Sequence, residues 1–272
     1  MMRKDIKLIA FDIDGTIVNK DDRLLEATKD IIKDLKQRGK EIVLCTGRTF
    51  NGFYWIREEL GLMDFDDYSI TCTGAFVRQN ATGKALIKKV LTKSDIENIY
   101  VKLDDKNIDF RIDTRDIFYC NSENLTEEFL SDQAVVRMPR LMYESLNDID
   151  DYIGRACFVS DENTLNSFES RHKEDFCKSY RYMRNDRRIT EILHKDAGKS
   201  ETLLDLVNML DLKLDQVMYF GDGVNDIKCL KAVGVGVAMG NAVEQTKQAA
   251  DFVIGDNNSP AIAEFLKDYF ND

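Results

Sequence analysis

Histidine and proline are nearly absent from this chain of 272 residues, which has two of each. Two histidines are too few to favour a histidine-rich metal site or a catalytic triad of serine, histidine and aspartate. With so little proline, 15 glycines and 43% hydrophobic residues, the composition is typical of a folded globular protein and not of a disordered one. We therefore expect any chemistry to depend mainly on carboxylates.

Long apolar runs and a surplus of basic residues are also missing. No uncharged apolar stretch approaches the roughly 18 residues of a membrane span. Arg3 and Lys4 near the start precede only a short apolar run, broken by Lys7 and Asp12, unlike a signal peptide. The net charge of −11 disfavours a general nucleic-acid-binding protein. We expect a cytoplasmic protein whose partners are neither membranes nor nucleic acids.

The six cysteines are scattered, and no two of them form a Cys-x-x-Cys pair of the kind that binds zinc or exchanges disulfides. Most lie within apolar runs. Reduced and mostly buried thiols are therefore the expected state.

The order of the expected elements indicates an α/β fold. An apolar strand at 6–11 is followed by a helical pattern that ends before Gly39, a strand at 42–44, a further helix and a strand at 68–72. The same alternation returns near the carboxyl end, with a strand at 217–220 among helical segments. Strands and helices in alternation predict a doubly wound parallel sheet, a Rossmann-like core.

The middle of the chain has a different pattern of apolar and polar residues. Between residues 83 and 188, extended runs face helical ones, which predicts an α+β cap inserted into the core. The expected domains are therefore a first core part at 1–82, the cap at 83–188 and a second core part at 189–272.

Polar side chains follow several of the expected core strands, and ligands of doubly wound sheets bind beyond such strand ends. Three or four carboxylates that converge on one point would repel each other unless a cation lay among them. An all-oxygen ligand set suits Mg²⁺, so the sequence predicts a magnesium site. The candidate residues are Asp12 and Asp14 after the first strand, Thr46 after the second, and Asp222, Asn225 and Asp226 after a late one.

A lysine and a hydroxyl beside bound magnesium are suited to holding a phosphoryl group, and Lys199 and Thr46 supply them here. Phosphoryl transfer needs alignment and charge neutralisation more than elaborate covalent chemistry. One of the carboxylates can then act as nucleophile and form an aspartyl-phosphate.

Four motifs in this order resemble the haloacid dehalogenase superfamily, and within it the Cof-like phosphatases with a type IIB cap. The likeness extends over nearly the whole chain, and its sharp motifs lie in the two core parts. They are Asp12-x-Asp14-Gly15-Thr16, then Thr46-Gly47-Arg48, then Lys199, then Gly221-Asp222-x-x-Asn225-Asp226.

The resemblance implies a role for each motif residue. Asp12 would attack phosphorus and bind Mg²⁺, and Asp222 would complete the metal shell. Asp14 would protonate the leaving oxygen and then activate water, with its backbone carbonyl on the metal. Of the others, Thr46, Gly47, Lys199 and Asn225 would hold the phosphate, Asp226 would orient metal waters or Lys199, and Arg48 would contact substrate or form a surface ion pair.

Two positions depart from the pattern of that family. Cof-like chains commonly have Asn-Gly-Ala where this chain has Thr73-Gly74-Ala75, which puts in question any contact made by that asparagine. They also commonly follow the motif lysine with glycine, where this chain has Ser200. Neither departure touches the expected nucleophile.

These features together predict a magnesium-dependent phosphatase for small phosphorylated metabolites, with sugar phosphates as the favoured class. A phosphomutase would share the first half-reaction but yield an isomer without free phosphate. A phospho-receiver module would hold its acyl phosphate instead of turning it over.

A basic run at 171–188 contains seven basic and three acidic residues. It could face the cleft and bind a second anionic group of the substrate, or it could protect a strand edge from aggregation. The second interpretation is favoured.

Overall fold

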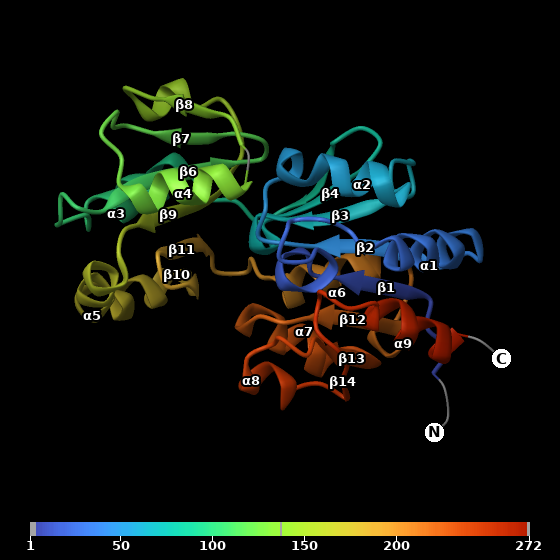
Figure 1. Ribbon diagram of the computed structural model, residues 1–272. Coiled ribbons are helices and arrows are strands. Elements are labelled where there is room, and N and C mark those ends of the chain that lie inside the picture. The colour runs from blue at the N-terminus through green and yellow to red at the C-terminus, as the bar shows by residue number, and fades with distance from the viewer. Residues whose placement is uncertain (1–3, 137, 271–272) are drawn as a thin grey trace.

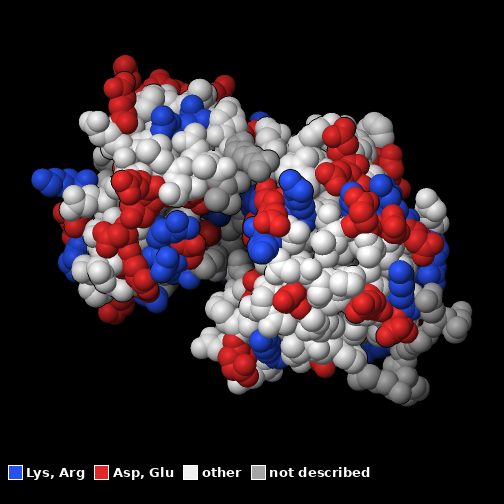
Figure 2. All heavy atoms as spheres, in the orientation of Figure 1, with Lys and Arg blue, Asp and Glu red and all other residues white. Residues whose placement is uncertain are grey.

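The computed structural model describes residues 4–136 and 138–270, which fold into two lobes (Figure 1). Residues 1–3, part of the segment considered above for a signal peptide, lie outside the described residues. The space-filling view shows a notch between the lobes and a face on which acidic and basic side chains are interspersed (Figure 2).

The larger lobe is built on an eight-stranded sheet in the order β14-β13-β12-β1-β2-β3-β4-β5. The strands from β14 to β3 are parallel, as expected, whereas β4 and β5 are antiparallel and form a hairpin at one edge. The fold class, a doubly wound α/β core, is confirmed. The bounds are β1 Leu8–Phe11, β2 Glu41–Cys45, β3 Tyr68–Thr71, β4 Phe76–Gln79, β5 Ala85–Lys88, β12 Val217–Gly221, β13 Val235–Ala238 and β14 Phe252–Val253.

Helices cover both faces of this sheet because successive side chains of a strand point to opposite faces. In β1, Ile9 and Phe11 pack in a core with helices α1, α2 and α9, while Leu8 and Ala10 pack in a second core with α6 and α7. The bounds are α1 Glu26–Gln37, α2 Tyr54–Leu60, α6 Lys199–Met209, α7 Ile227–Ala232, α8 Glu244–Lys247 and α9 Ala261–Phe270.

The smaller lobe, the cap, contains a six-stranded sheet in the order β10-β11-β9-β6-β7-β8, mainly antiparallel. Helices α3 and α5 pack on one face of this sheet, and α4 packs against the other. The bounds are β6 Asp109–Thr114, β7 Phe118–Cys120, β8 Arg140–Met142, β9 Ile153–Val159, β10 Tyr180–Asp186, β11 Ile189–His194, α3 Lys93–Tyr100, α4 Glu127–Val136 and α5 Glu162–Ser179.

The limits of the two sheets differ slightly from the expected divisions at 83 and 188. Strand β5 pairs with β4 in the core sheet, and β11 pairs with β9 in the cap sheet. The chain therefore passes from the core to the cap after Lys88 and returns to the core after His194.

Five of the six cysteines are buried and Cys177 is exposed; none forms a disulfide. This agrees with the expectation of mostly buried thiols. No helix within the described residues combines the length and the apolar character that crossing a bilayer requires.

Candidate active site

The sheet order brings three motif loops to one edge. Strand β1 lies between β12 and β2, and Asp12, Thr46 and Asp222 directly follow these three strands. The backbone N–H of Asp12 donates to the carbonyl of Phe220 at 2.9 Å, which holds the end of β1 beside β12. The carboxyl ends of parallel strands thus place residues distant in sequence side by side.

Lys199, at the start of α6, joins the first and last motifs. Its Nζ lies 2.7 Å from Asp12 Oδ1 and 2.8 Å from Asp226 Oδ1, and its side chain is 1% exposed. Burial by itself would lower the pKa of Lys199, but the two carboxylates outweigh it and raise that pKa well above its usual value. The lysine is therefore a fixed positive charge beside the expected nucleophile.

Asp226 is fully buried, and its hydrogen bonds fill both carboxylate oxygens. Oδ1 accepts from Lys199 and, at 2.7 Å, from the hydroxyl of Tyr219, while Oδ2 accepts from the backbone N–H groups of Asp222 and Gly223. A carboxylate has about four lone-pair positions, so little capacity is left for another ligand. Asp226 thus orients Lys199 and the loop that carries Asp222.

Asp12, Asp222 and Asp226 form an acidic group whose carboxylate oxygens lie within 4.8 Å of one another. Burial and the neighbouring carboxylates raise the pKa of Asp12 well above its usual value, and burial followed by Asp226 raises the pKa of Asp222 to about 6. Burial is the larger cause of both shifts and repulsion between the carboxylates the second, and a bound cation would offset both. The donor set fits a hard divalent cation such as Mg²⁺, and Asp12 and Asp222 would hold it.

The turn after Asp12 requires glycine at position 15. Gly15 has a φ of +76°, and a Cβ there would lie 2.2 Å from Oδ2 of Asp222. Thr16, the next residue, donates its hydroxyl to Asp222 Oδ1 at 3.3 Å. The Asp12–Thr16 motif therefore has two effects: Asp12 and Asp14 supply carboxylates, and Gly15 and Thr16 position the carboxylate of Asp222.

Thr46 and Gly47 line the same region from β2. Thr46 is fully buried, and its hydroxyl oxygen accepts the backbone N–H of Arg48 at 3.0 Å, which leaves the hydroxyl proton to donate. Gly47 lies against two polar side chains, since a Cβ there would be in van der Waals contact with Thr73 Oγ1 at 3.4 Å and Arg155 Nη1 at 3.7 Å. The Thr46-Gly47-Arg48 motif thus faces a cap side chain, Arg155.

Asp14 lies apart from the acidic group in this structure, and its side chain is 54% exposed. The buried guanidinium of Arg48 donates to both of its oxygens, the shortest contact being 2.7 Å, and also to Asp22 Oδ1 at 2.8 Å. Arg48, for which substrate contact or a surface ion pair was expected, is itself 4% exposed and forms a partly buried ion pair with the half-exposed Asp14.

Two cavities flank the motif residues. One of about 280 Å³ is lined by Lys199 and Asn225 from the core and by Arg181 and Tyr182 from β10 of the cap. The other, of about 600 Å³, is lined by Asp14, Gly15 and Arg48 and by Ala134 of α4. The motif residues therefore lie where core and cap meet, with room for a small molecule.

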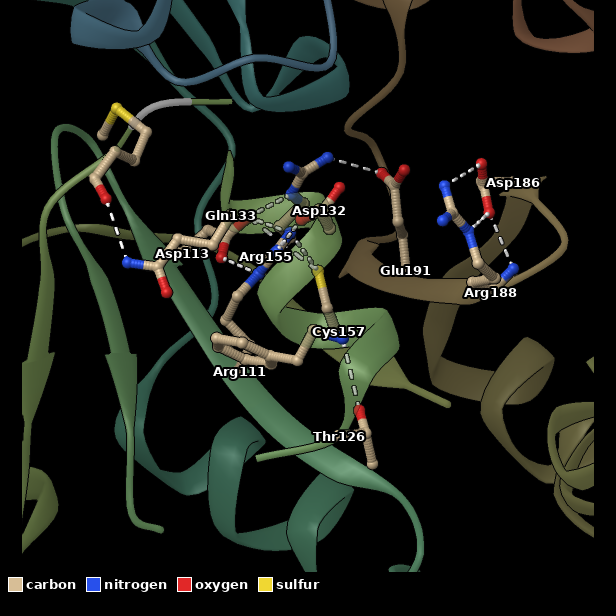
Figure 3. Close-up of polar contacts among 12 residues, drawn as sticks. Arg111, Asp113, Thr126, Asp132, Gln133, Arg155, Cys157, Asp186, Arg188 and Glu191 are labelled. Carbon is tan, nitrogen blue, oxygen red and sulfur yellow. Dashed lines mark hydrogen bonds and ion pairs between the residues drawn. The ribbon is translucent and has the colours of Figure 1, made fainter. Parts of the chain in front are cut away.

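A buried charged cluster on the cap sheet approaches the motif loops. Arg155 Nε donates to Asp113 Oδ2 at 2.7 Å, and its Nη1 donates to Glu191 Oε2 at 2.9 Å and to Thr73 Oγ1 at 3.0 Å. Figure 3 shows the side chains of Asp113 and Glu191 on either side of Arg155, with Arg111 nearby. Thr73 belongs to the core, so this cluster connects the cap sheet to the loop after β3.

Thr73 adopts a φ of +54°, a conformation that β-branched residues rarely take. Its hydroxyl donates to Glu191 Oε2 at 2.7 Å while accepting from Arg155. Thr73, which stands where Cof-like chains commonly have asparagine, is therefore the residue that contacts Glu191 and Arg155 of the cap. Backbone strain of this kind is found mainly at functional sites.

Several site residues were not predicted from the sequence. Tyr219 lies in an apolar strand and looks like a core residue there. The cap cluster had a signal, because charged residues that alternate within apolar strands, as Arg111 and Asp113 do, mark a buried polar face. The residues missed are Tyr219, Asp22, Arg111, Asp113, Asp132, Arg155 and Glu191.

Comparisons with known proteins agree with the fold and the order of the motifs. The family model described as haloacid dehalogenase-like hydrolase matches residues 9–266. YxeH of Bacillus subtilis (strain 168), named as a candidate phosphatase without a stated substrate, is 29% identical over 262 residues, which cover 96% of this chain and 97% of that protein.

Solved structures share the fold. A haloacid dehalogenase-like hydrolase from Bacteroides thetaiotaomicron has a TM-score of 0.89 and 22% identity, covering 97% of this chain and 100% of its own. A subclass IIB sugar phosphatase named BT4131 has a TM-score of 0.79 and 20% identity, covering 97% of this chain and 98% of its own.

The fold and site thus define a hydrolase with a Rossmann-like core and an inserted cap. The chain belongs to the haloacid dehalogenase-like hydrolases. The resemblance drawn from the four motifs is confirmed. The predicted enzyme class, a phosphoric monoester hydrolase, is confirmed at the level of this hydrolase family, and its relative YxeH bears a phosphatase name.

Proposed function

We propose that this enzyme is a magnesium-dependent phosphatase that hydrolyses small phosphorylated metabolites through a phosphoryl group carried on Asp12. The observation that carries the proposal is that Asp12, Asp222 and Lys199 lie together. Asp12 and Asp222 follow the neighbouring strands β1 and β12, and Nζ of Lys199, at the start of α6, lies 2.7 Å from Asp12 Oδ1. When bound, Mg²⁺ would supply charge neutralisation for the transferring phosphoryl group.

Asp12 is the proposed nucleophile because only one of its carboxylate oxygens is engaged by a described side chain. Oδ1 accepts from Lys199, and Lys199 is the only side chain of the described residues that donates to Asp12. Oδ2 is therefore available to attack phosphorus. Lys199 would hold a phosphoryl oxygen on the same side, as would the hydroxyl of Thr46, and Asn225 lines the adjoining cavity.

Asp14 is the proposed acid and base, and its pairing with Arg48 sets a condition on that role. Both oxygens of the Asp14 carboxylate accept hydrogen bonds from the Arg48 guanidinium, so the group is engaged in this arrangement. Asp14 must therefore turn away from Arg48 when substrate enters the 600 Å³ cavity that both residues line. Arg48 would then keep its second partner, Asp22.

The leaving group is proposed to be an uncharged polyol, which is why sugar phosphates are the favoured class. In the cap cluster, two arginines face three carboxylates, so the cluster offers no unmatched positive charge to a second anion. Hydroxyl groups suit it because each can donate to a carboxylate and accept from a guanidinium. The ion pairs join Arg111 to Asp113 and Asp132, and Arg155 to Asp113 and Glu191.

One contact in this cluster has hydrogen-bonding capacity to spare. Arg111 Nε lies 2.7 Å from Asp113 Oδ1, but the orientation makes the contact an ion pair without a hydrogen bond. The basic run at 171–188 does not change the charge balance, since its Arg181 is paired with Glu201 and its Arg184 with Glu169.

The direct test is hydrolysis of a generic aryl phosphate. We expect metal-dependent release of phosphate that a chelator abolishes and that Asp12→Asn reduces at least about a thousandfold, because the nucleophile is lost. Asp30→Asn, the same change at an exposed position of α1, is the matched control and should keep full activity. Full activity of Asp12→Asn would refute the assignment of the nucleophile.

A further inference from the structure

A cavity of about 420 Å³ lies where the β4–β5 hairpin of the core meets the cap, and none of the motif residues discussed above lines it. Its walls come from the segment around α2, from β4 and the turn after it, and from the turn between β6 and β7. The charged and aromatic lining residues are Phe50, Tyr54, Arg57, Arg78, Arg115 and Asp116.

Arg57 is buried in this wall without a carboxylate partner. It is 1% exposed, and no acidic side chain of the described residues lies within ion-pair distance of it. Its Nη1 donates to the carbonyl of Phe50 at 2.5 Å, and its Nε is buried with no hydrogen-bond partner. Its guanidinium carbon lies 3.5 Å from the centre of the Phe50 ring. An unmatched buried charge is unfavourable unless something neutralises it.

A second arginine increases the positive charge at the same ring. The guanidinium carbon of Arg78 lies 4.4 Å from the centre of the Phe50 ring, and Arg78 is 2% exposed. Burial followed by the proximity of Arg78 lowers the pKa of Arg57 to about 10, and burial lowers the pKa of Arg78 as well. Asp116, 3.2 Å from Arg78, is the one carboxylate that lines the cavity. Arg78 is paired with Asp116 and Arg115 with Asp151, so the unmatched positive charge of this wall, within an acidic protein, is that of Arg57.

We propose that this cavity is a second anion-binding site, which takes the phosphate or carboxylate group of a small metabolite between Arg57, Arg78 and Arg115. Guanidinium groups bind both kinds of oxyanion with paired hydrogen bonds. The volume lies in the range of small-molecule sites, so the anion has room for an organic body against Phe50 and Tyr54.

The site joins the two lobes. Arg78 belongs to the core, and its Nη1 donates to the backbone carbonyl of Arg115 and to Asp116 in the cap. Arg115 reaches the same cavity from the cap side while paired with Asp151. A bound anion would therefore contact both lobes at a place separate from the catalytic residues.

The experiment is calorimetric titration of the wild-type protein with inorganic phosphate and, separately, with malonate in magnesium-free buffer. We expect at least one of these anions to show a binding event that Arg57→Gln weakens at least about tenfold. Dependence on Arg57 for phosphate alone or for malonate alone identifies the oxyanion. Arg38→Gln is the matched control, because Arg38 is an exposed arginine directly after α1. This variant should leave the binding event unchanged.

The proposal is overturned if neither anion binds in a way that depends on Arg57. A phosphate event that Arg57→Gln leaves unchanged belongs to the catalytic residues and does not support the second site. If Arg57→Gln does not fold, Arg115→Gln decides in its place, because this side chain is 33% exposed and its loss leaves no buried gap. The outcome is independent of catalysis, since an Arg57-dependent event can be seen whether or not the enzyme turns over.

Discussion

At the scale of single residues, Gly15 shows how closely the motif loops approach one another. Its backbone has a φ of +76°, and the Asp222 carboxylate occupies the space that a side chain would need. The absence of space for a side chain shows that the turn after β1 lies directly against the loop after β12. Glycine is needed here for space as well as for conformation.

We predict that Gly15→Ala lowers phosphatase activity and magnesium affinity, each by about a hundredfold, because the new Cβ displaces the Asp222 carboxylate. Gly39→Ala is the matched control: Gly39 has a φ of +80°, but a Cβ there meets nothing within 4 Å. Gly39→Ala should cost about 1 kcal/mol of stability and leave activity intact. Equal activity losses in the two variants would contradict this account.

Motif residues next to strand ends are easier to find in the sequence than a polar group within an apolar strand. Asp12, Thr46 and Asp222 stand out in the sequence because a polar residue directly after an apolar run interrupts the pattern. Tyr219 belongs to the apolar run of β12, and nothing in the sequence distinguishes its hydroxyl, which binds Asp226, from that of an ordinary core tyrosine.

At the scale of elements, helix α6 connects the two lobes at its first turn. Lys199 binds the carboxylates of Asp12 and Asp226, and Glu201 two residues later pairs with Arg181 of β10. The guanidinium of Arg181 binds both oxygens of Glu201, at 2.7 Å and 2.6 Å. Burial tends to raise the pKa of Glu201, but the hydrogen bonds from Arg181 outweigh it and lower the pKa to about 2.

We predict that Glu201→Gln destabilises the protein by about 1 kcal/mol near neutral pH, a figure reduced for the partial exposure of the pair. A carboxylate with a lowered folded-state pKa stabilises fully above its unfolded pKa of about 4.5. The difference between wild type and variant should therefore be constant from pH 7 to 5 and shrink as the pH falls from about 4.5 toward 2.

The free energy of unfolding in urea at a series of pH values measures this difference. Glu58→Gln is the control, since Glu58 is exposed and its side chain makes no ion pair with any described residue. A Glu201→Gln difference that grew on acidification would contradict the lowered pKa.

The parallel strands of the core were predicted close to their actual bounds, because buried strands read as short apolar runs between turn signals. The β4–β5 hairpin was missed, since both of its strands mix apolar and polar residues and β5, the edge strand, is only partly buried. Helix α5 was missed for a similar reason: 3 of its 18 residues are buried hydrophobic ones, so its periodicity is weak.

At the scale of the whole molecule, the fold gathers carboxylates that repel each other, and a cation should therefore stabilise the folded protein. We predict that Mg²⁺ at ten times its dissociation constant adds about 1.4 kcal/mol of stability, which raises the melting temperature by roughly 2–3 °C. Asp222→Asn should abolish most of that increase. A melting temperature indifferent to Mg²⁺ in the wild type would count against the metal site.

The division into core and cap was predictable from the change in texture along the chain, whereas the cap's contribution to the site was not. Arg155 and Glu191 lie on strands with no motif, and they approach Thr73 only because the cap folds back onto the core. Contacts between lobes depend on packing between distant segments, which a single sequence does not display.

The most direct test of the central claim is to mix the enzyme with Mg²⁺ and radiolabelled acetyl phosphate, quench in acid within milliseconds and locate the label. The account predicts a short-lived, hydroxylamine-sensitive phosphoryl group on the peptide that carries Asp12, absent from Asp12→Asn and released as phosphate when quenching is delayed. Phosphate released by the wild type with no label on that peptide at any time, or label on another residue, would contradict it.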